Sequence, residues 1–226
     1  MSINQPAILG KWFELNIKGL RDFFSFMEAS IKEAEDKYIE KYQDSIKDLS
    51  EEEIEEFTEI YGDEFHGYNK YKQRLYSSFL IIIFSFLETS LNTICRNIKK
   101  IKDKAGVKIK LSDIKGKDIE RAKIYLNKIC GCSDSFFGTR IWQEIKMLQA
   151  VRNAFVHNEG KIPKEKKGDA LKKYIADNPD YFSHKNIELD HNVYPVYILV
   201  KEKYCLSSLN NIEIFLGQLL KDISWK

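Results

Sequence analysis

The sequence of 226 residues has few of the residues that interrupt regular structure, with eleven Gly and four Pro. A multi-stranded sandwich needs a turn signal roughly every 8 to 12 residues, so this scarcity argues against one. The sequence shows no internal repeat, and 43% of its residues are apolar. This composition excludes a disordered or collagenous chain and predicts a mainly helical protein with one domain and one hydrophobic core.

Cysteines are also few and irregularly spaced, at Cys95, Cys130, Cys132 and Cys205. Because no secretory leader pattern opens the sequence, we expect no disulfide framework and a cytoplasmic location. Cys130 and Cys132 lack the second pair of ligands that a zinc site requires. The residues Asp190 to Asn192 are explained as well by a hairpin turn as by metal binding with His184. We therefore expect no metal and no other cofactor.

Long hydrophobic runs are missing as well. The most apolar stretch, residues 79–91, contains Glu88 and is shorter than the ~20 apolar residues that span a bilayer. It predicts a buried helix and no membrane contact. The sequence also contains no P-loop, no dinucleotide-binding fingerprint and no serine-hydrolase elbow, which argues against an NTPase, a dehydrogenase or an α/β hydrolase.

Charge is balanced overall, at +2, but it is unevenly distributed. Residues 32–65 hold fourteen acidic residues against four Lys, whereas residues 96–128 hold twelve Lys or Arg against four acidic residues. Residues 161–173 add six Lys against two acidic residues. Lysine-rich stretches are usually solvated faces, but two of them also suit a phosphate-rich partner. The acidic stretch predicts either a site for a basic partner or a cover for the basic groove.

Helical periodicity dominates the chain. It predicts helices over residues 11–48, 68–103, 118–129, 139–158 and 204–223. Ser50 and Glu53 form a capping-box pattern that predicts a short acidic helix to residue 61, followed by a break over residues 62–67. Residues 107–111 alternate like a short extended piece. Residues 161–186 predict a lysine-rich loop with one helical turn around residues 171–175, and residues 187–189 and 193–200 predict a small hairpin.

One cluster of reactive side chains stands out near the end of the fourth of these main helices. Arg152, Asn153 and His157 form the pattern R-N-x-x-x-H. The Arg-to-His spacing alone is a weak signal, but the adjacent Asn makes a chance match much rarer. In this motif the sequence resembles the HEPN superfamily, the higher eukaryotes and prokaryotes nucleotide-binding domains. The run of long amphipathic helices resembles that family only loosely.

The resemblance implies an all-α, up-and-down helical bundle, here with a small β-hairpin insertion before the C-terminal helix. It further implies a metal-independent endoribonuclease, in which Arg152, Asn153 and His157 are catalytic and the motifs of a homodimer form a composite active site. Similar motifs occur in toxins and in antiviral-defence effectors, so we expect such a setting, with an antitoxin or other regulatory protein as a possible partner. The acidic stretch and the hairpin depart from a minimal HEPN bundle.

The chemistry of these residues can be argued independently. RNA carries its own nucleophile, the 2′-hydroxyl, so cleavage needs a base, an acid and a cation for the phosphorane charge. A histidine can serve as base or acid, and the arginine fork matches phosphate oxygens. One histidine cannot easily do both in a single step, which favours a symmetric dimer. The expected products carry 2′,3′-cyclic phosphate and 5′-hydroxyl ends.

Helix geometry places Asn153 and His157 on one outward face and Arg152 on the apolar face. A buried guanidinium needs a partner, and the candidate is Glu88, which we expect either to hold Arg152 or to reach solvent. Fraying of the last helical turn would let all three motif residues converge. The expected RNA-binding residues lie beside and after the motif: Lys146, Lys161, Lys164, Lys166 and Lys167.

Other interpretations of the motif remain open from the sequence. Arg152 and His157 are also explained as a surface cation and a helix cap. The motif also occurs in non-catalytic HEPN modules that bind a nucleotide or a protein partner. A structural helical dimer is the third alternative.

Overall fold

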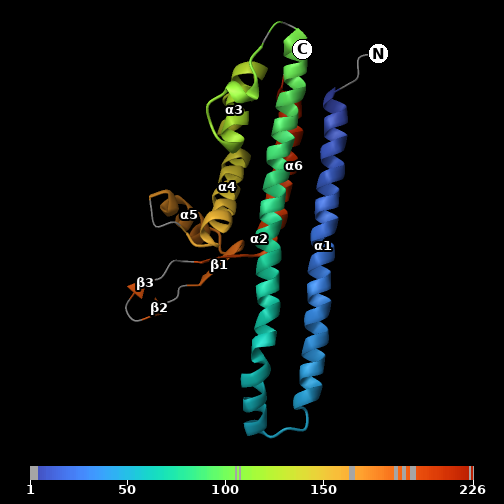
Figure 1. Ribbon diagram of the computed structural model, residues 1–226, viewed down its shortest axis with the longest axis vertical. Coiled ribbons are helices and arrows are strands. Elements are labelled where there is room, and N and C mark those ends of the chain that lie inside the picture. The colour runs from blue at the N-terminus through green and yellow to red at the C-terminus, as the bar shows by residue number, and fades with distance from the viewer. Residues whose placement is uncertain are drawn as a thin grey trace.

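The computed structural model describes residues 5–104, 106, 108–162, 166–185, 188–189, 192–193, 197–223 and 225. Within these ranges, the side chains of residues 62–66, 104, 166–167, 184–185, 188–189 and 192–193 are outside the description. The protein is mostly helical with a small antiparallel sheet, as predicted for the all-α class. Figure 1 shows its central feature, a long hairpin of α1 (Gln5–Ile46) and α2 (Glu51–Lys104).

The α1–α2 hairpin follows from two sequence features. The expected capping box is present, because Glu53 Oε2 accepts hydrogen bonds from the Ser50 backbone N at 2.8 Å and from its hydroxyl. Along α1, the apolar stripe of the sequence is buried at Phe13, Ile17 and Phe24. The Phe24 ring packs against Phe79 of α2 with centroids 4.4 Å apart.

The predicted break at residues 62–67 is wrong, because α2 continues through it. A glycine inside a helix costs only about 1 kcal/mol relative to alanine, which packing against a neighbouring helix offsets. The neighbour here is α1: the Tyr38 hydroxyl donates to the Tyr61 carbonyl at 3.0 Å, and its ring lies 5.7 Å from that of Tyr68. The acidic residues 32–65 therefore form the distal third of the hairpin, which extends beyond the other helices (Figure 1).

The hydrophobic core surrounds the proximal half of α2. Helix α6 (Glu202–Asp222) packs against α1, α2 and α4 (Arg140–Asn158), and α3 (Asp118–Cys130) packs against α2. Phe79, Leu80, Ile83, Phe84 and Leu87 of α2 are fully buried. Helices α3, α4 and α6 begin and end within two residues of their predicted bounds, and α3 ends at Gly131, whose φ is +69°.

The region between α4 and α6 is more ordered than the sequence predicts. Instead of one helical turn, α5 (Lys166–Asp177) forms three turns, because Leu171 and Ile175 are both buried. The expected hairpin is present where β2 (Glu188–Leu189) pairs with β3 (Asn192–Val193). The later part of its second predicted strand is a separate strand, β4 (Tyr197–Val200), whose partner is the unpredicted β1 (Phe182–Lys185). Gln73 of α2 anchors β4 through both its amide atoms, which bond the Val200 carbonyl and N at 2.9 and 3.0 Å.

The connection between α2 and α3 contains a single turn of 3-10 helix at Leu111–Asp113. Of the extended piece expected over residues 107–111, Lys110 has extended backbone angles, but residues 108–111 form no strand, and Val107 lies outside the described residues. The turn that follows is stabilised locally, because the Asp113 side chain accepts a hydrogen bond from the Lys110 backbone N at 2.9 Å.

One stretch of α2, within residues 67–103, is long and apolar enough to cross a membrane by length and composition alone. Half of that stretch is buried inside the molecule, as is also found in core helices. The expectation of no membrane contact therefore remains a prediction.

Candidate functional site

Helix α4 carries the R-N-x-x-x-H motif at its C-terminal end. The helix begins after Thr139, whose hydroxyl accepts a hydrogen bond from the Trp142 backbone N at 3.4 Å. Its apolar face is buried against the other helices at Trp142, Ile145, Leu148, Val151 and Ala154. Figure 1 shows that α4 runs alongside α2 in the opposite direction. The motif is therefore held on a rigid element of the bundle.

Arg152 is half-buried and faces α2, as the helix geometry predicts. Its guanidinium carbon lies 5.4 Å from the ring centroid of Phe84, and Nη1 donates to Asn153 Oδ1 at 2.9 Å. Its Nε is buried and has no hydrogen-bond partner. A half-buried guanidinium held by a ring and an amide keeps its planar fork in a fixed orientation, which suits phosphate binding.

His157 lies on an exposed part of the last turn of α4. The turn is firmly capped: Gly160, with a φ of +81°, donates from N to the Ala154 carbonyl at 3.0 Å, and its own carbonyl accepts from Ile198 N at 3.0 Å. The fraying that would gather the motif is therefore not found. Five residues along a helix separate Arg152 and His157 by about 140° around its axis, so one chain does not bring them together.

Of the two alternatives for Glu88, a direct ion pair with Arg152 is not found among the ion pairs of the described residues. The two side chains still interact electrostatically. Burial raises the pKa of Glu88, the positive charge of Arg152 lowers it, and the negative charge of Asp118 raises it further. Desolvation is the larger effect, so the pKa of Glu88 stays above its usual value despite the attraction of Arg152.

A cleft of about 430 Å³ opens between α2 and α3, on the side of Glu88. It lies close to the motif helix, because the Gln149 amide of α4 reaches Asp118 in its wall at 3.4 Å. The basic side chains in its lining are Lys117 and Arg121, which the sequence patterns did not single out. The signal for them was the net positive stretch 96–128. The full lining is Ser85, Glu88, Thr89, Leu91, Asn92, Lys117, Asp118, Ile119, Arg121 and Ala122.

The predicted RNA-binding lysines are only partly available. Lys146 Nζ lies 3.7 Å from Glu120 of α3. Lys161 Nζ lies 3.2 Å from Glu159 and 5.5 Å from the Tyr197 ring centroid. Lys164 and the side chains of Lys166 and Lys167 lie outside the described residues, although both of the latter belong to the first turn of α5. Lys146 and Lys161 thus each lie close to a glutamate. Because these pairs are exposed, a phosphate could replace the glutamate as the partner of the lysine.

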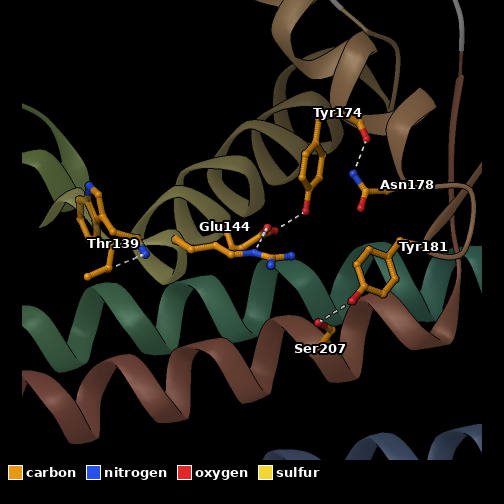
Figure 2. Close-up of polar contacts among 8 residues, drawn as sticks. Thr139, Glu144, Tyr174, Asn178, Tyr181 and Ser207 are labelled. Atoms are coloured by element: carbon orange, nitrogen blue, oxygen red, sulfur yellow. Dashed lines mark hydrogen bonds and ion pairs between the residues drawn. The ribbon is translucent and has the colours of Figure 1, made fainter. Parts of the chain in front are cut away.

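A second cleft, of about 570 Å³, lies between α4, α5 and α6. Figure 2 shows its polar contacts: the Tyr174 hydroxyl donates to Glu144 at 2.6 Å, and Tyr181 and Ser207 share a bond of 3.2 Å. Burial raises the pKa of Tyr174 well above its usual range, so its hydroxyl keeps the proton that it donates. These bonds fasten α5 to the bundle. Neither cleft is lined by a residue of the motif.

The cysteines are all free and buried. Burial raises the pKa of the Cys130 thiol to about 12, which keeps it in the unreactive thiol form. Cys132 Sγ donates to Asp222 at 3.0 Å. Within the described ranges, no group of three or more His, Cys, Asp or Glu side chains could hold a metal ion. Asp190 and His191 lie outside those ranges, as does the His184 side chain.

Comparison of this sequence and structure with known proteins gives no significant match. The sequence matches no protein-family model, and no curated protein or solved structure matches it significantly. Membership of the HEPN superfamily therefore stays a prediction from the sequence motif.

Proposed function

We propose that this protein is a metal-independent, HEPN-type endoribonuclease acting as a homodimer with a composite active site. The observation that carries the proposal is the state of Arg152. Its guanidinium is half-buried against Phe84 and Asn153 and lies on the same helix as an exposed histidine. A planar guanidinium held in this way matches the geometry of phosphate oxygens.

The reaction needs three functions from these residues. A neutral His157 takes the proton of the RNA 2′-hydroxyl while the 2′-oxygen attacks phosphorus. Arg152 stabilises the charge on the non-bridging phosphate oxygens, and Asn153 holds the guanidinium in place. A protonated histidine gives its proton to the departing 5′-oxygen. The products are a 2′,3′-cyclic phosphate and a 5′-hydroxyl.

The capped end of α4 explains why a dimer is needed. Because His157 and Arg152 point in directions about 140° apart, a single chain offers one histidine and a distant cation. A second copy supplies the acid when the first supplies the base. We place RNA along the cleft of Lys117 and Arg121 and the lysines after α4, so binding should weaken steeply with salt.

The setting we propose is a toxin or an antiviral-defence effector in the cytoplasm. The distal hairpin of residues 32–65 is the surface we assign to a basic antitoxin or regulatory protein. Its acidic residues extend beyond the bundle, so a partner can bind them without disturbing the core (Figure 1). The same extension separates the hairpin tip from α4, which argues against a cover formed within one chain.

A second candidate function is a non-catalytic module that binds a nucleotide. It is favoured by the cleft between α2 and α3, whose 430 Å³ and two basic side chains suit a nucleotide better than a folded RNA. In this case neither Arg152 nor His157 would be needed for binding, because neither lines the cleft.

The test compares the wild type with His157→Ala on labelled tRNA and single-stranded RNA in excess EDTA. The matched control is Val156→Ala, an exposed neighbour on the same turn. Cleavage by the wild type and the control, with cyclic-phosphate ends and a loss of at least about 100-fold in His157→Ala, is the expected result. Nucleotide binding without cleavage would favour the second candidate instead.

A further inference from the structure

Helix α1 carries a second line of apolar residues, which the described chain leaves partly exposed. Phe13, Ile17 and Phe24 face the core, but another set on the flank of the helix is 38% to 68% exposed. We call this set the exposed stripe, and it consists of Ile8, Trp12, Leu15, Phe23 and Phe26. An isolated exposed apolar residue is ordinary, but a stripe along several turns of one helix marks an interaction surface.

The exposed stripe is symmetric about Gly19. Leu15 and Phe23 lie four residues before and after it, and Trp12 and Phe26 lie seven before and after. A two-fold axis at Gly19 that pairs α1 with a second, antiparallel α1 therefore brings Leu15 against Phe23 and Trp12 against Phe26. The stripe is thus complementary to itself, as an isologous interface requires.

Within the part of the chain that the structure describes, no contact requires glycine at position 19. A side-chain carbon built there meets nothing within 4 Å, and its φ is not in the left-handed region, so no contact or turn requires glycine. Glycine inside a helix is destabilising relative to alanine. At the centre of a helix pair, however, it lets the two backbones approach closely.

Charges beside the stripe favour the antiparallel arrangement. Lys18 precedes Gly19 and Asp22 follows it, and helical geometry places both on the same flank of the stripe. Antiparallel pairing brings Lys18 of each copy within about 3 Å, measured along the axis, of Asp22 of the other. In a parallel two-fold pair, this flank of each copy would lie on the opposite side of the interface, so the two charges could not meet. Both side chains are exposed and therefore available for the contact.

We propose that the exposed stripe is the interface through which two copies of this chain dimerise, with their α1 helices antiparallel around Gly19. The interface does not depend on the proposed ribonuclease function. Phe13 and Phe24, on either side of Gly19, contact Phe86 and Phe79 of α2, and Arg152 contacts Phe84 between them. Both motifs therefore lie level with the two-fold axis, but on the opposite side of α2 from α1 (Figure 1), so this interface does not itself bring the two motifs together.

Site-specific cross-linking tests the arrangement in the full chain. All four native cysteines are buried, so an introduced surface cysteine is the reactive one. A mixture of Leu15→Cys and Phe23→Cys proteins should give a disulfide-linked heterodimer under mild oxidation, whereas each protein alone should give little. Cross-linking of each variant with itself, and not in the mixture, would overturn the antiparallel arrangement.

Sedimentation without RNA measures the affinity, independently of any cleavage. The wild type should dimerise, and Gly19→Ala should weaken the dimer about tenfold, whereas Gly217→Ala, at an exposed open position of α6, should not. Lys18→Glu should weaken it about threefold to tenfold, and adding Asp22→Lys should restore it. A wild type that stays monomeric from nanomolar to submillimolar concentration would overturn the proposal. Flotation of such a monomer with phosphatidylglycerol vesicles would make the stripe a membrane contact instead.

Discussion

Helices α1 and α4 both pack against α2, on opposite sides of it (Figure 1), but they present different chemistry to their surroundings. α4 buries its apolar face and leaves a polar edge with Asn153 and His157. α1 buries one apolar stripe and leaves a second exposed. The exposed edge of α4 suits a charged ligand, whereas the exposed face of α1 suits another protein surface. Helix α4 thus carries the residues of the proposed reaction, and α1 carries the proposed dimer interface.

The two stripes of α1 can be separated by two neighbouring phenylalanines. Phe24→Ala removes a ring with 1% exposure, so unfolding free energy should fall by about 3–5 kcal/mol. Phe23→Ala removes a ring with 43% exposure and should change the stability of the monomer by less than about 0.5 kcal/mol. Chemical denaturation at high dilution gives both values. Equal losses would show that Phe23 also belongs to the core.

The role of α4 is tested by replacing the planar guanidinium of Arg152 with an ammonium group. Arg152→Lys keeps the charge but loses the planar fork, so RNA cleavage should fall by about 10²- to 10³-fold. Loss of the contact with Phe84 should lower unfolding free energy by only about 1 kcal/mol. Arg140→Lys, at the exposed start of the same helix, is the control and should cleave normally. Full activity in Arg152→Lys would mean that the motif is not the phosphate site.

The rigid end of α4 is tested at Gly160. A side-chain carbon there would lie 2.9 Å from Phe155, and its φ of +81° is strained for other residues. Gly160→Ala should therefore cost about 1–3 kcal/mol of unfolding free energy. Gly217→Ala, which meets no atom, should be neutral or slightly stabilising. A neutral Gly160→Ala would show that the end of the helix yields easily.

The smallest expected effect is at Glu88. Its folded pKa lies above the ordinary 4.5, mainly because of burial, so its contribution to stability is fully present at low pH and is lost as pH rises through the raised value. Because glutamine does not ionise, the stability of Glu88→Gln does not fall as the pH rises through this pKa. Its stability relative to the wild type should therefore rise between about pH 4.5 and neutral, as thermal unfolding at several pH values would show. A variant that becomes less stable toward neutral pH would mean that ionised Glu88 holds Arg152 after all.

Local sequence signals predicted much of this fold. The periodicity of α3, α4 and α6 and the capping box at Ser50 needed only neighbouring residues, and all are confirmed. The breaks at Gly62 and Gly67 were wrong because packing against α1 is a non-local effect. β1 was missed for the same reason, since its pairing with β4 spans more than a dozen residues.

The candidate site likewise has a part that could be predicted from local sequence and a part that could not. The direction of Arg152 followed from helical geometry, but its neighbours did not. Phe84 and Asn153, and not Glu88, hold the guanidinium. The exposed stripe of α1 was also missed, because the longer heptad-like pattern of Phe13 and Ile17 marks the buried face. The spacing of the stripe about Gly19 was nevertheless present in the sequence.

The most direct measurement of the central claim uses two oligonucleotides of one sequence, one of plain RNA and one with 2′-O-methyl groups. Each is incubated in excess EDTA with the wild type and with His157→Ala. The account predicts that the wild type cuts only plain RNA, leaving cyclic-phosphate ends, and that the variant cuts neither. Cutting of the methylated strand, or equal cutting by His157→Ala, would contradict cleavage by the 2′-hydroxyl at this motif.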